Sequence, residues 1–529
     1  MRTPIFFPGF GSIGLVCLAG VTVLTGTEPA QVDPRAGLTQ QGRTMLSVIK
    51  AQELKGDLSF LASDTLQGRF TPSPGLDVAA EFIASRFRAA GLEPGGDQDY
   101  FQVAQMVDRH MPRAKTGITL LGGPETVNIP ADSFVIYDVS QAAVIKSAPV
   151  LVFPSRDIGA LRKADVSGKA ILVKDINFKG LSQDKARSEY TRMLTFDREV
   201  GKSNAAVEIV VSQSKSRVSD SRLLSLEDAA KRSVPLILVQ SGELQKLLER
   251  PDGFAEQQSV TVDIPAPDDR NVTLKNVIGV LRGSDPQLKS TCVLLTAHYD
   301  HIGTTETAAN SGVPPKSSEA GDNIYNGAND DGSGTVSVIE IAKAMGRLSP
   351  HPKRSIVFMT FFGEERGELG SKYYGAHPAF PIAKSVADVN LEQVGRTDST
   401  AGKQINTASL TGYDYSDVTK YLEAAGRLTG VKVYEDKEAS DAYFTRSDNA
   451  ALALQGVPAH SLTVAFDYPD YHSVGDDWQK VDYDNMARVD RMVALGLLSI
   501  ANNAKAPQWN AGNPKTQSFR EAQRKSRTQ

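Results

Sequence analysis

The chain has 529 residues, of which 40% are hydrophobic, and this length predicts two to four domains with large cores. A formal net charge of -4, with acidic and basic residues interspersed, gives no reason to expect a nucleic-acid or membrane-surface partner. The composition is typical of an ordinary globular protein, and charge does not select a substrate.

The N-terminus has the order of a secretory signal. Arg2 is followed by an apolar stretch to about Leu24 and then by small and polar residues. This order predicts a signal peptide over residues 1–30, an extracytoplasmic location (periplasmic or secreted), and no stable membrane association after cleavage. An uncleaved membrane anchor is the alternative, because the stretch approaches the roughly 17 to 25 residues that span a bilayer. Cleavage would leave Cys292 as the only cysteine, which predicts a packed core thiol and no intramolecular disulfide.

The spacing of apolar residues changes twice in the next part of the chain. Apolar residues at helical spacing predict two helices between residues 46 and 92, joined by a loop rich in proline and glycine. From about 115 to 265 the chain shows short strand-like runs instead. The runs VSGKAILVKD and SVPLILVQSGELQKLL resemble the protease-associated domain, a small β-rich module inserted into secreted peptidases. We interpret residues 115–265 as such an inserted domain, with an α/β subdomain of another type as the alternative.

The segment from 270 to 503 returns to alternating strands and helices. This alternation predicts an α/β fold with a mixed, mostly parallel sheet flanked by helices. Residues 45–114 would belong to the same domain, which the insert interrupts. Residues 504–529 are polar and basic and lack apolar periodicity, so we expect a solvated tail.

The stretch from Val293 to Thr335 carries the first candidate site. A buried strand ends at Ala297, and His298 and Asp300 follow it. Polar, metal-competent side chains at the carboxyl end of a buried strand are typical of sites in open α/β sheets. The glycine-rich turn NGANDDGSG then supplies Asp330 and leads into a helix.

Five side chains of metal-binding type stand at the ends of apolar runs. Two imidazoles and three carboxylates suit a pair of zinc ions, with one carboxylate bridging and an open position for water. Singly, each has an ordinary explanation as a capping, surface or core residue. The five are His298, Asp330, Glu365, Glu392 and His472.

The motifs around these residues carry a family resemblance. HYDHIG, NGANDDGSG, FFGEERGELGS, NLEQVGR and DYHSVGDD occur in the order seen in the two-zinc aminopeptidases. The chain therefore resembles metallopeptidase family twenty-eight of clan MH over residues 45–110 and 270–503. The resemblance implies the zinc-exopeptidase fold, two Zn²⁺ ions, and hydrolysis of N-terminal residues from peptide substrates. Glutamate carboxypeptidases and glutaminyl cyclases are in the same family.

The resemblance also implies the ligand roles. His298 and Glu392 would ligate one zinc ion, Glu365 and His472 would ligate the other, and Asp330 would bridge both. In this family the peptide bond after the bridging aspartate is often cis, and the same is implied here.

Three further residues receive roles from the resemblance. Asp300 would orient His298, and Glu364 would be the general base that takes a proton from the zinc-held water. Tyr471 would place a hydroxyl near the developing oxyanion. Glu364 directly precedes a ligand, so a turn after Gly363 must bring both adjacent carboxylates to the site.

Two positions depart from the family pattern, and two rival functions stay open. Glu392 stands where relatives usually have aspartate, which leaves the metal preference open. Asn449 stands where relatives often have histidine, in a loop expected to border the substrate pocket.

A glutamate carboxypeptidase-like exopeptidase would need clustered arginines, for which Arg396 and Arg446 are candidates. A non-catalytic binding protein on the same scaffold is the other rival, but such proteins lose ligands or the base. The preferred substrate and the oligomeric state stay open.

Overall fold

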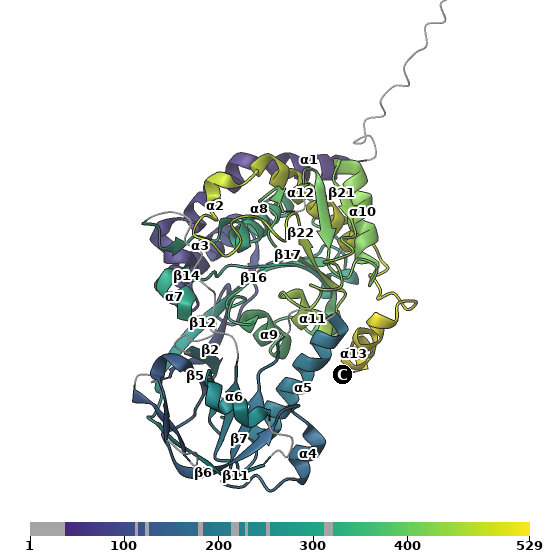
Figure 1. Ribbon diagram of the computed structural model, residues 1–529. Coiled ribbons are helices and arrows are strands. Elements are labelled where there is room, and N and C mark those ends of the chain that lie inside the picture. Colours follow the sequence, from purple (N-terminus) through teal and green to yellow (C-terminus); the bar gives the residue numbers. More distant parts are fainter. Residues whose placement is uncertain are drawn as a thin grey trace, which may run out of the picture.

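The computed structural model describes residues 38–111, 115–121, 126–177, 183–212, 222–227, 231–249, 254–310, 321–400 and 402–528. The expected signal peptide over residues 1–30 lies outside this part. Figure 1 shows two sheets, one above the other, each with its own helices. Within the described ranges, no helix is long and apolar enough to cross a membrane.

The first sheet is mixed, with parallel strands at its centre. Its ten strands are β1 (Glu93–Pro94), β2 (Phe101–His110), β9 (Arg222–Leu226), β12 (Asp268–Leu281), β13 (Cys292–His298), β16 (Ser355–Phe361), β17 (Ser385–Leu391), β20 (Thr407–Leu410), β21 (Lys432–Tyr434) and β22 (Ala459–Thr463). Their order is β21-β20-β22-β17-β13-β16-β12-β2-β9, with β1 paired to β12. Strands β22, β17, β13 and β16 run parallel, whereas β12, β2 and β9 continue the sheet antiparallel. The predicted mixed α/β fold is confirmed.

Helices cover both faces of this sheet, so its central strands are buried along their whole length. Successive side chains of a strand point to opposite faces. Leu295 accordingly packs in the cluster with α2 (Ala51–Leu61), α3 (Pro74–Ala89), α8 (Gly334–Gly346), α10 (Val418–Thr429) and α12 (Tyr483–Asn502), and α1 (Gln40–Val48) adds to it. Leu294 packs in the cluster with α9 (Leu369–Ala376), α11 (Asn449–Leu454) and α13 (Gln517–Thr528).

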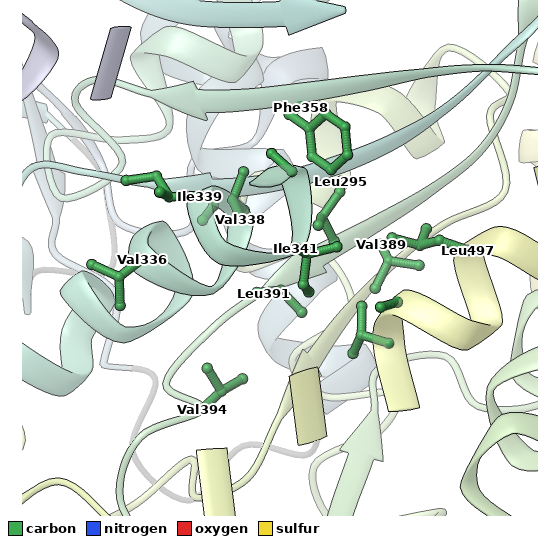
Figure 2. Packing of buried hydrophobic residues seen from close by; sticks show 14 of the residues in the cluster. Leu295, Val336, Val338, Ile339, Ile341, Phe358, Val389, Leu391, Val394 and Leu497 are labelled. Atoms are coloured by element: carbon green, nitrogen blue, oxygen red, sulfur yellow. The ribbon is translucent and has the colours of Figure 1, made fainter. Parts of the chain in front are cut away.

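The helix α8 lies directly against the central strands. In Figure 2 its side chains, such as Ile341, lie among Leu295 of β13, Phe358 of β16 and Val389 of β17, with Leu497 of α12 close by. All of these side chains are buried. The helix begins where the glycine-rich turn ends, so the same core that buries α8 also holds that turn at the edge of the sheet.

The C-terminal segment corrects the expectation of a solvated tail over residues 504–529. Trp509 and Phe519 are 5% and 3% exposed, and their rings stack with centroids 5.0 Å apart. Phe519 also contacts the ring of Phe444, and the helix α13 carries it. The prediction was wrong because two aromatic anchors separated by polar residues give no apolar periodicity.

The second sheet accounts for most of the segment interpreted as an insert. Its strands are β3 (Gly117–Leu121), β4 (Val127–Ile129), β5 (Phe134–Asp138), β6 (Ala143–Phe153), β7 (Ala170–Lys174), β8 (Val207–Val211), β10 (Leu236–Val239) and β11 (Phe254–Ile264). The helices α4 (Ile158–Lys163), α5 (Gln183–Gly201) and α6 (Gly242–Leu248) belong to the same stretch. The likeness to a protease-associated domain stays a prediction.

One strand of that stretch belongs to the first sheet. The strand β9 pairs antiparallel with β2, from Met106↔Leu226 to His110↔Arg222. The side chain of Arg222 also forms an ion pair with Asp108 of β2. The sequence RLLSL has the same short apolar pattern as its neighbours, so the pattern alone did not separate it from the second sheet.

Cys292 is a core thiol, as predicted. It is 1% exposed, and its Sγ lies 3.6 Å from the Ser385 hydroxyl on the neighbouring strand. Burial raises the pKa of the thiol to about 11, so the reactive thiolate is disfavoured at neutral pH.

A buried carboxyl on α12 makes stability depend on pH. Asp490 is 0% exposed, and burial raises its pKa to about 8. The folded protein therefore holds this proton more tightly than the unfolded chain, whose pKa is about 3.9, and the free energy of unfolding decreases as pH rises from about 4 to about 8. Asp490→Asn is expected to raise Tm at pH 8 but not at pH 4. The exposed Asp484→Asn should show no such pH-dependent gain, and an equal Tm change at both pH values would contradict the assignment.

Candidate metal centre and active site

The predicted ligand residues lie together at one edge of the first sheet. His298 ends β13, Glu365 follows β16, Glu392 follows β17 directly, and His472 lies in the loop after β22. Asp330 lies in the turn η7 (Ala328–Ser333), which leads into α8. Because the four strands are parallel, their carboxyl ends meet at the same edge, where open α/β sheets place their sites.

Asp330 stands between the two imidazoles. Its Oδ1 lies 3.3 Å from Nε2 of His298, and its Oδ2 lies 3.1 Å from Nε2 of His472. Glu392 Oε1 lies 3.3 Å from the same nitrogen of His298, and Glu365 Oε1 lies 3.3 Å from that of His472. The structure therefore brings all five predicted side chains together as two adjoining groups that share Asp330. The peptide bond between Asp330 and Asp331 is cis, as the resemblance implies.

The donor atoms fit divalent cations. Two groups each offer three ligand atoms within 4.8 Å of one another: His298, Asp330 and Glu392, and His301, Asp330 and Glu365. Among the described residues, Glu365 Oε1 and both ring nitrogens of His301 are buried without a hydrogen-bond partner. Buried polar atoms are normally paired, and nitrogen and carboxylate oxygen donors are zinc ligands. His301 was not among the predicted ligands.

Carboxylates and imidazoles shift one another's pKa in this cluster. Burial lowers the pKa of His472, but Glu365 and Asp330 outweigh it and raise that pKa to about 11. Burial raises the pKa of Glu365, but His472 and His301 oppose it and the pKa falls to about 2. The pKa of Asp330 lies well below its usual range, although burial opposes this, because His298 and His472 stabilise its charge. The site thus favours anionic oxygens that face a positive charge.

The adjacent carboxylates Glu364 and Glu365 diverge at a turn. Gly363 has a left-handed φ of 68° just after β16, and Glu364 Oε2 then lies 3.9 Å from Nε2 of His298 while Glu365 faces His472. The expected turn is present. Burial, reinforced by the charges of Glu392 and Glu365, raises the pKa of Glu364 well above its usual range.

Asp300 links the ligand segment to the turn that carries Glu364. Its Oδ1 lies 3.5 Å from Nδ1 of His298 and accepts a hydrogen bond of 3.1 Å from the backbone N–H of Glu364. Thr71 donates to Oδ2. The resemblance implied the contact with His298, but not the contact with the backbone of Glu364.

Tyr471 lies over the ring of His472. The two rings stack with centroids 4.1 Å apart and planes inclined by 24°. His472 has a φ of 52°, a conformation that a non-glycine residue adopts only when its surroundings enforce it. Burial raises the pKa of the Tyr471 hydroxyl, so this hydroxyl keeps its proton and remains a donor.

Sequence reasoning missed the residues that hold the ligands. Asp476 accepts hydrogen bonds from the backbone N–H groups of Asn329 and Asp330, each at 3.1 Å through Oδ1 and Oδ2 respectively. Ser447 donates to Glu392 Oε2 at 2.7 Å, which leaves Oε1 of that longer side chain facing His298. Asp476 lies inside the motif DYHSVGDD, so its place beside His472 was the available signal.

Arg69 braces the site from the N-terminal part of the chain. Its guanidinium is fully buried and donates to the carbonyl oxygens of Leu61, Tyr299, Asn326 and Gly327 at 2.7 to 2.9 Å. Leu61 ends α2, whereas Tyr299 directly follows β13 and Asn326 and Gly327 directly precede η7, so one side chain joins the two segments that carry His298 and Asp330. No sequence signal pointed to it, because backbone acceptors leave no pattern in side chains.

Residues 276–496 match the model of peptidase family M28. The chain therefore carries a segment that matches this family. Its M28 segment contains all five predicted ligands and both proposed catalytic side chains, Glu364 and Tyr471.

Curated relatives of this chain include peptidases from fungi and bacteria. Probable leucine aminopeptidase 2 of Aspergillus oryzae is 26% identical over 64% of this chain and 64% of its own. A probable zinc metalloprotease of Pyrenophora tritici-repentis is 34% identical over 47% of this chain and 56% of its own. Aminopeptidase YwaD of Bacillus subtilis is 29% identical over 49% of this chain and 52% of its own. The chain thus spans less than two thirds of the length of these curated relatives.

The fold of this chain is also similar to that of a solved aminopeptidase. The aminopeptidase from Aneurinibacillus sp. strain AM-1 has a TM-score of 0.56 and 18% identity, over 89% of this chain and 97% of that chain. This likeness shows the fold.

Asn449, which stands where relatives often have histidine, lies in the core. Its side chain is fully buried, donates to the carbonyl oxygen of Phe444 at 2.9 Å and accepts from the hydroxyl of Ser461 at 2.9 Å. It therefore holds the start of α11 against β22 rather than facing a substrate pocket. The expectation that this loop borders the substrate pocket stays a prediction, and Ser447 of the same loop contacts the candidate ligand Glu392.

Proposed function

We propose that the protein is an extracytoplasmic aminopeptidase that uses two zinc ions to hydrolyse the N-terminal peptide bond of peptides. The observation that carries the proposal is the pair of ligand groups that meet at Asp330, with the carboxylate of Glu364 beside them. The names of the M28 relatives, which include aminopeptidases and a zinc metalloprotease, support the same reaction. The signal-like order of residues 1–30 supports the location.

The metal ligands follow from the two groups. His298 and Glu392 would hold one zinc ion, Glu365 and His472 the other, and Asp330 would contact both. Bound zinc supplies Lewis acidity, which polarises the scissile carbonyl and lowers the pKa of water.

The chain's own residues then move the protons and hold the groups that move them. Glu364 Oε2 accepts a proton from the attacking water and gives it to the nitrogen of the leaving amine. Its raised pKa suits this exchange, because a general base works best when its pKa lies near the working pH. Asp300 holds the backbone of Glu364, and the Tyr471 hydroxyl donates a hydrogen bond to the oxyanion.

The carboxypeptidase alternative needs a free arginine for the substrate's carboxylate. The side chain of Arg396 is 4% exposed and already pairs with Asp398 at 2.6 Å and Asp470 at 2.9 Å. The guanidinium of Arg446 lies over the ring of Tyr443, 4.7 Å from its centroid. The charge of Arg396 is therefore already compensated, which argues against Arg396 as the anchor of a substrate carboxylate. Against a non-catalytic scaffold, all five ligand positions and Glu364 carry suitable groups.

A substrate panel tests the direction of attack. The purified protein should hydrolyse aminoacyl p-nitroanilides and release the first residue of short peptides. Acetylation of the peptide's α-amine should block release, because the amine would lose its charge and its access to the metal ligands. Peptides ending in glutamate are the comparison. Release of C-terminal glutamate without release of the N-terminal residue would contradict the aminopeptidase proposal.

Metal removal tests the dependence on zinc. Dialysis against a chelator should abolish hydrolysis of aminoacyl anilides, because the carbonyl and the water lose their Lewis acid. Added zinc should restore the rate, with about two ions bound per chain by elemental analysis. A parallel sample dialysed against the zinc-saturated chelator is the control and should keep its activity. Full activity in metal-free protein would refute the proposal.

A further inference from the structure

His301 is a buried imidazole whose role the family motifs do not supply. It follows Asp300 directly and is 1% exposed. Its Nδ1 lies 2.8 Å from Glu365 Oε1, and one of its nitrogens lies within 4.8 Å of ligand atoms of both Asp330 and Glu365. His301 and His472 therefore approach the same carboxylate oxygen, that of Glu365, and His301 is absent from the group that contains His298.

The contact between His301 and Glu365 lacks the geometry of a hydrogen bond. Within the part of the chain that the structure describes, three buried atoms here lack a hydrogen-bond partner: both ring nitrogens of His301, and Glu365 Oε1. A buried imidazole that merely oriented a ligand would donate or accept such a bond, as His460 does to Ser416 and Thr411. His301 Nδ1 and Glu365 Oε1 lie close together without facing each other, which fits two metal-ligand atoms directed at one ion.

Two donor spacings around Glu365 are close to those of one coordination shell. Ligand atoms held about 2.0–2.2 Å from a tetrahedral zinc ion lie about 3.4 Å apart. Glu365 Oε1 lies 2.8 Å from His301 Nδ1 and 3.3 Å from His472 Nε2. The rings of His301 and His472 meet edge to face at 71°, with centroids 5.6 Å apart. The two imidazoles thus approach the same carboxylate oxygen from different directions.

The backbone around His301 is built for a close approach. Gly327 has a left-handed φ of 57°, and a Cβ there would lie 2.4 Å from Cγ of His301. Only glycine leaves room for the ring at this point. Arg69 fixes both sides of the contact, because its carbonyl accepts from the N–H of His301 at 3.3 Å and its guanidinium donates to the carbonyl of Gly327.

We infer that His301 is a ligand of the second metal ion, in addition to His472, Glu365 and the bridging Asp330. The inference rests on the proposed two-zinc function. With four protein donors the second position is more fully coordinated than the first, which has His298, Glu392 and Asp330. Zinc sites with four protein ligands are closed and hold their metal, whereas sites with three keep a position open for water. The two positions therefore differ in affinity, and the second retains its ion longer.

Zinc titration of full-length protein tests the inference. Metal-free wild-type protein should bind two ions with separate affinities in competition with a chromogenic chelator. His301→Gln should weaken the tighter ion by more than about 100-fold, beyond the roughly 10- to 100-fold that loss of an outer partner causes. His460→Gln, which removes another buried imidazole, should leave both affinities unchanged.

X-ray absorption on wild-type protein loaded with two zinc ions gives a second measurement that needs no variant. Three imidazoles shared by two ions give an average of about 1.5 per zinc, and His298 and His472 alone give about one. An average near one, or a loss below about 100-fold in His301→Gln, would overturn the inference while leaving the two-zinc function intact. Failure of the wild type to bind zinc would instead refute the proposed function itself.

Discussion

Replacing Glu364 with glutamine is expected to lower kcat/KM by about 10²- to 10⁴-fold while about two metal ions per chain stay bound. Glutamine keeps the shape of the side chain but cannot accept the proton from water. The metals should remain, because Glu364 is absent from both groups of candidate ligands and lies 3.9 Å from the nearest imidazole nitrogen. Rates on an aminoacyl anilide and elemental analysis of the same sample measure both effects.

The matched control for this variant is Glu368→Gln. Glu368 lies in the same segment after β16, but its carboxylate pairs with Lys372 rather than with the metal ligands. This variant should retain activity. Wild-type rates in Glu364→Gln would remove the general base from the mechanism, and loss of metal from that variant would instead make Glu364 a ligand.

The second large effect is expected at Asp330. In the described chain this carboxylate is the one that contacts the imidazoles of both His298 and His472. Asp330→Asn should therefore weaken both ions by more than about 100-fold, and hydrolysis should be lost with them. The turn should persist, because Asp476 holds the backbone N–H of this residue rather than its side chain. Zinc titration together with circular dichroism separates metal loss from unfolding.

Asp331→Asn is the control for removing a neighbouring charge. Asp331 Oδ1 accepts from the backbone N–H groups of Gly334 and Gln393, which an amide oxygen can also do. Burial, reinforced by the charge of Glu392, raises the pKa of Asp331 well above its usual range and so disfavours the charge that this variant removes. This variant should bind zinc normally. Equal loss of zinc in both variants would show that the turn, and not the bridging carboxylate, was damaged.

The grouping of the candidate ligands could be predicted because each motif pairs an apolar strand with the polar residue at its end. His298 and Glu392 follow buried runs, and parallel pairing then brings such ends to one edge. The ordered motifs supplied the roles of Asp330, Glu365 and His472, which the spacing alone did not give. The mixed sheet was predictable for the same reason, since it depends on a pattern that local sequence carries.

The residues that were missed act through contacts between distant segments. Arg69 donates to backbone carbonyl oxygens, which every residue has, so these hydrogen bonds do not depend on any pattern of side chains in the sequence. His301 looked like an ordinary histidine after an aspartate, because its partner Glu365 belongs to another strand end. Trp509 and Phe519 anchor a segment that is otherwise polar. The roles of these residues depend on tertiary contacts, so only the three-dimensional structure reveals them.

The pairing of β9 with β2 limits how the two sheets can move against each other. A module joined only by its two ends can swing about them, whereas a hydrogen-bonded ladder must break before it rotates. The carbonyl oxygen of Arg222 in β9 also accepts a hydrogen bond of 2.5 Å from Arg366, the residue after Glu365. A displacement of the second sheet that carried β9 would therefore break this hydrogen bond or move the turn that carries Glu364, so the orientation of the sheets and the position of Glu364 are linked.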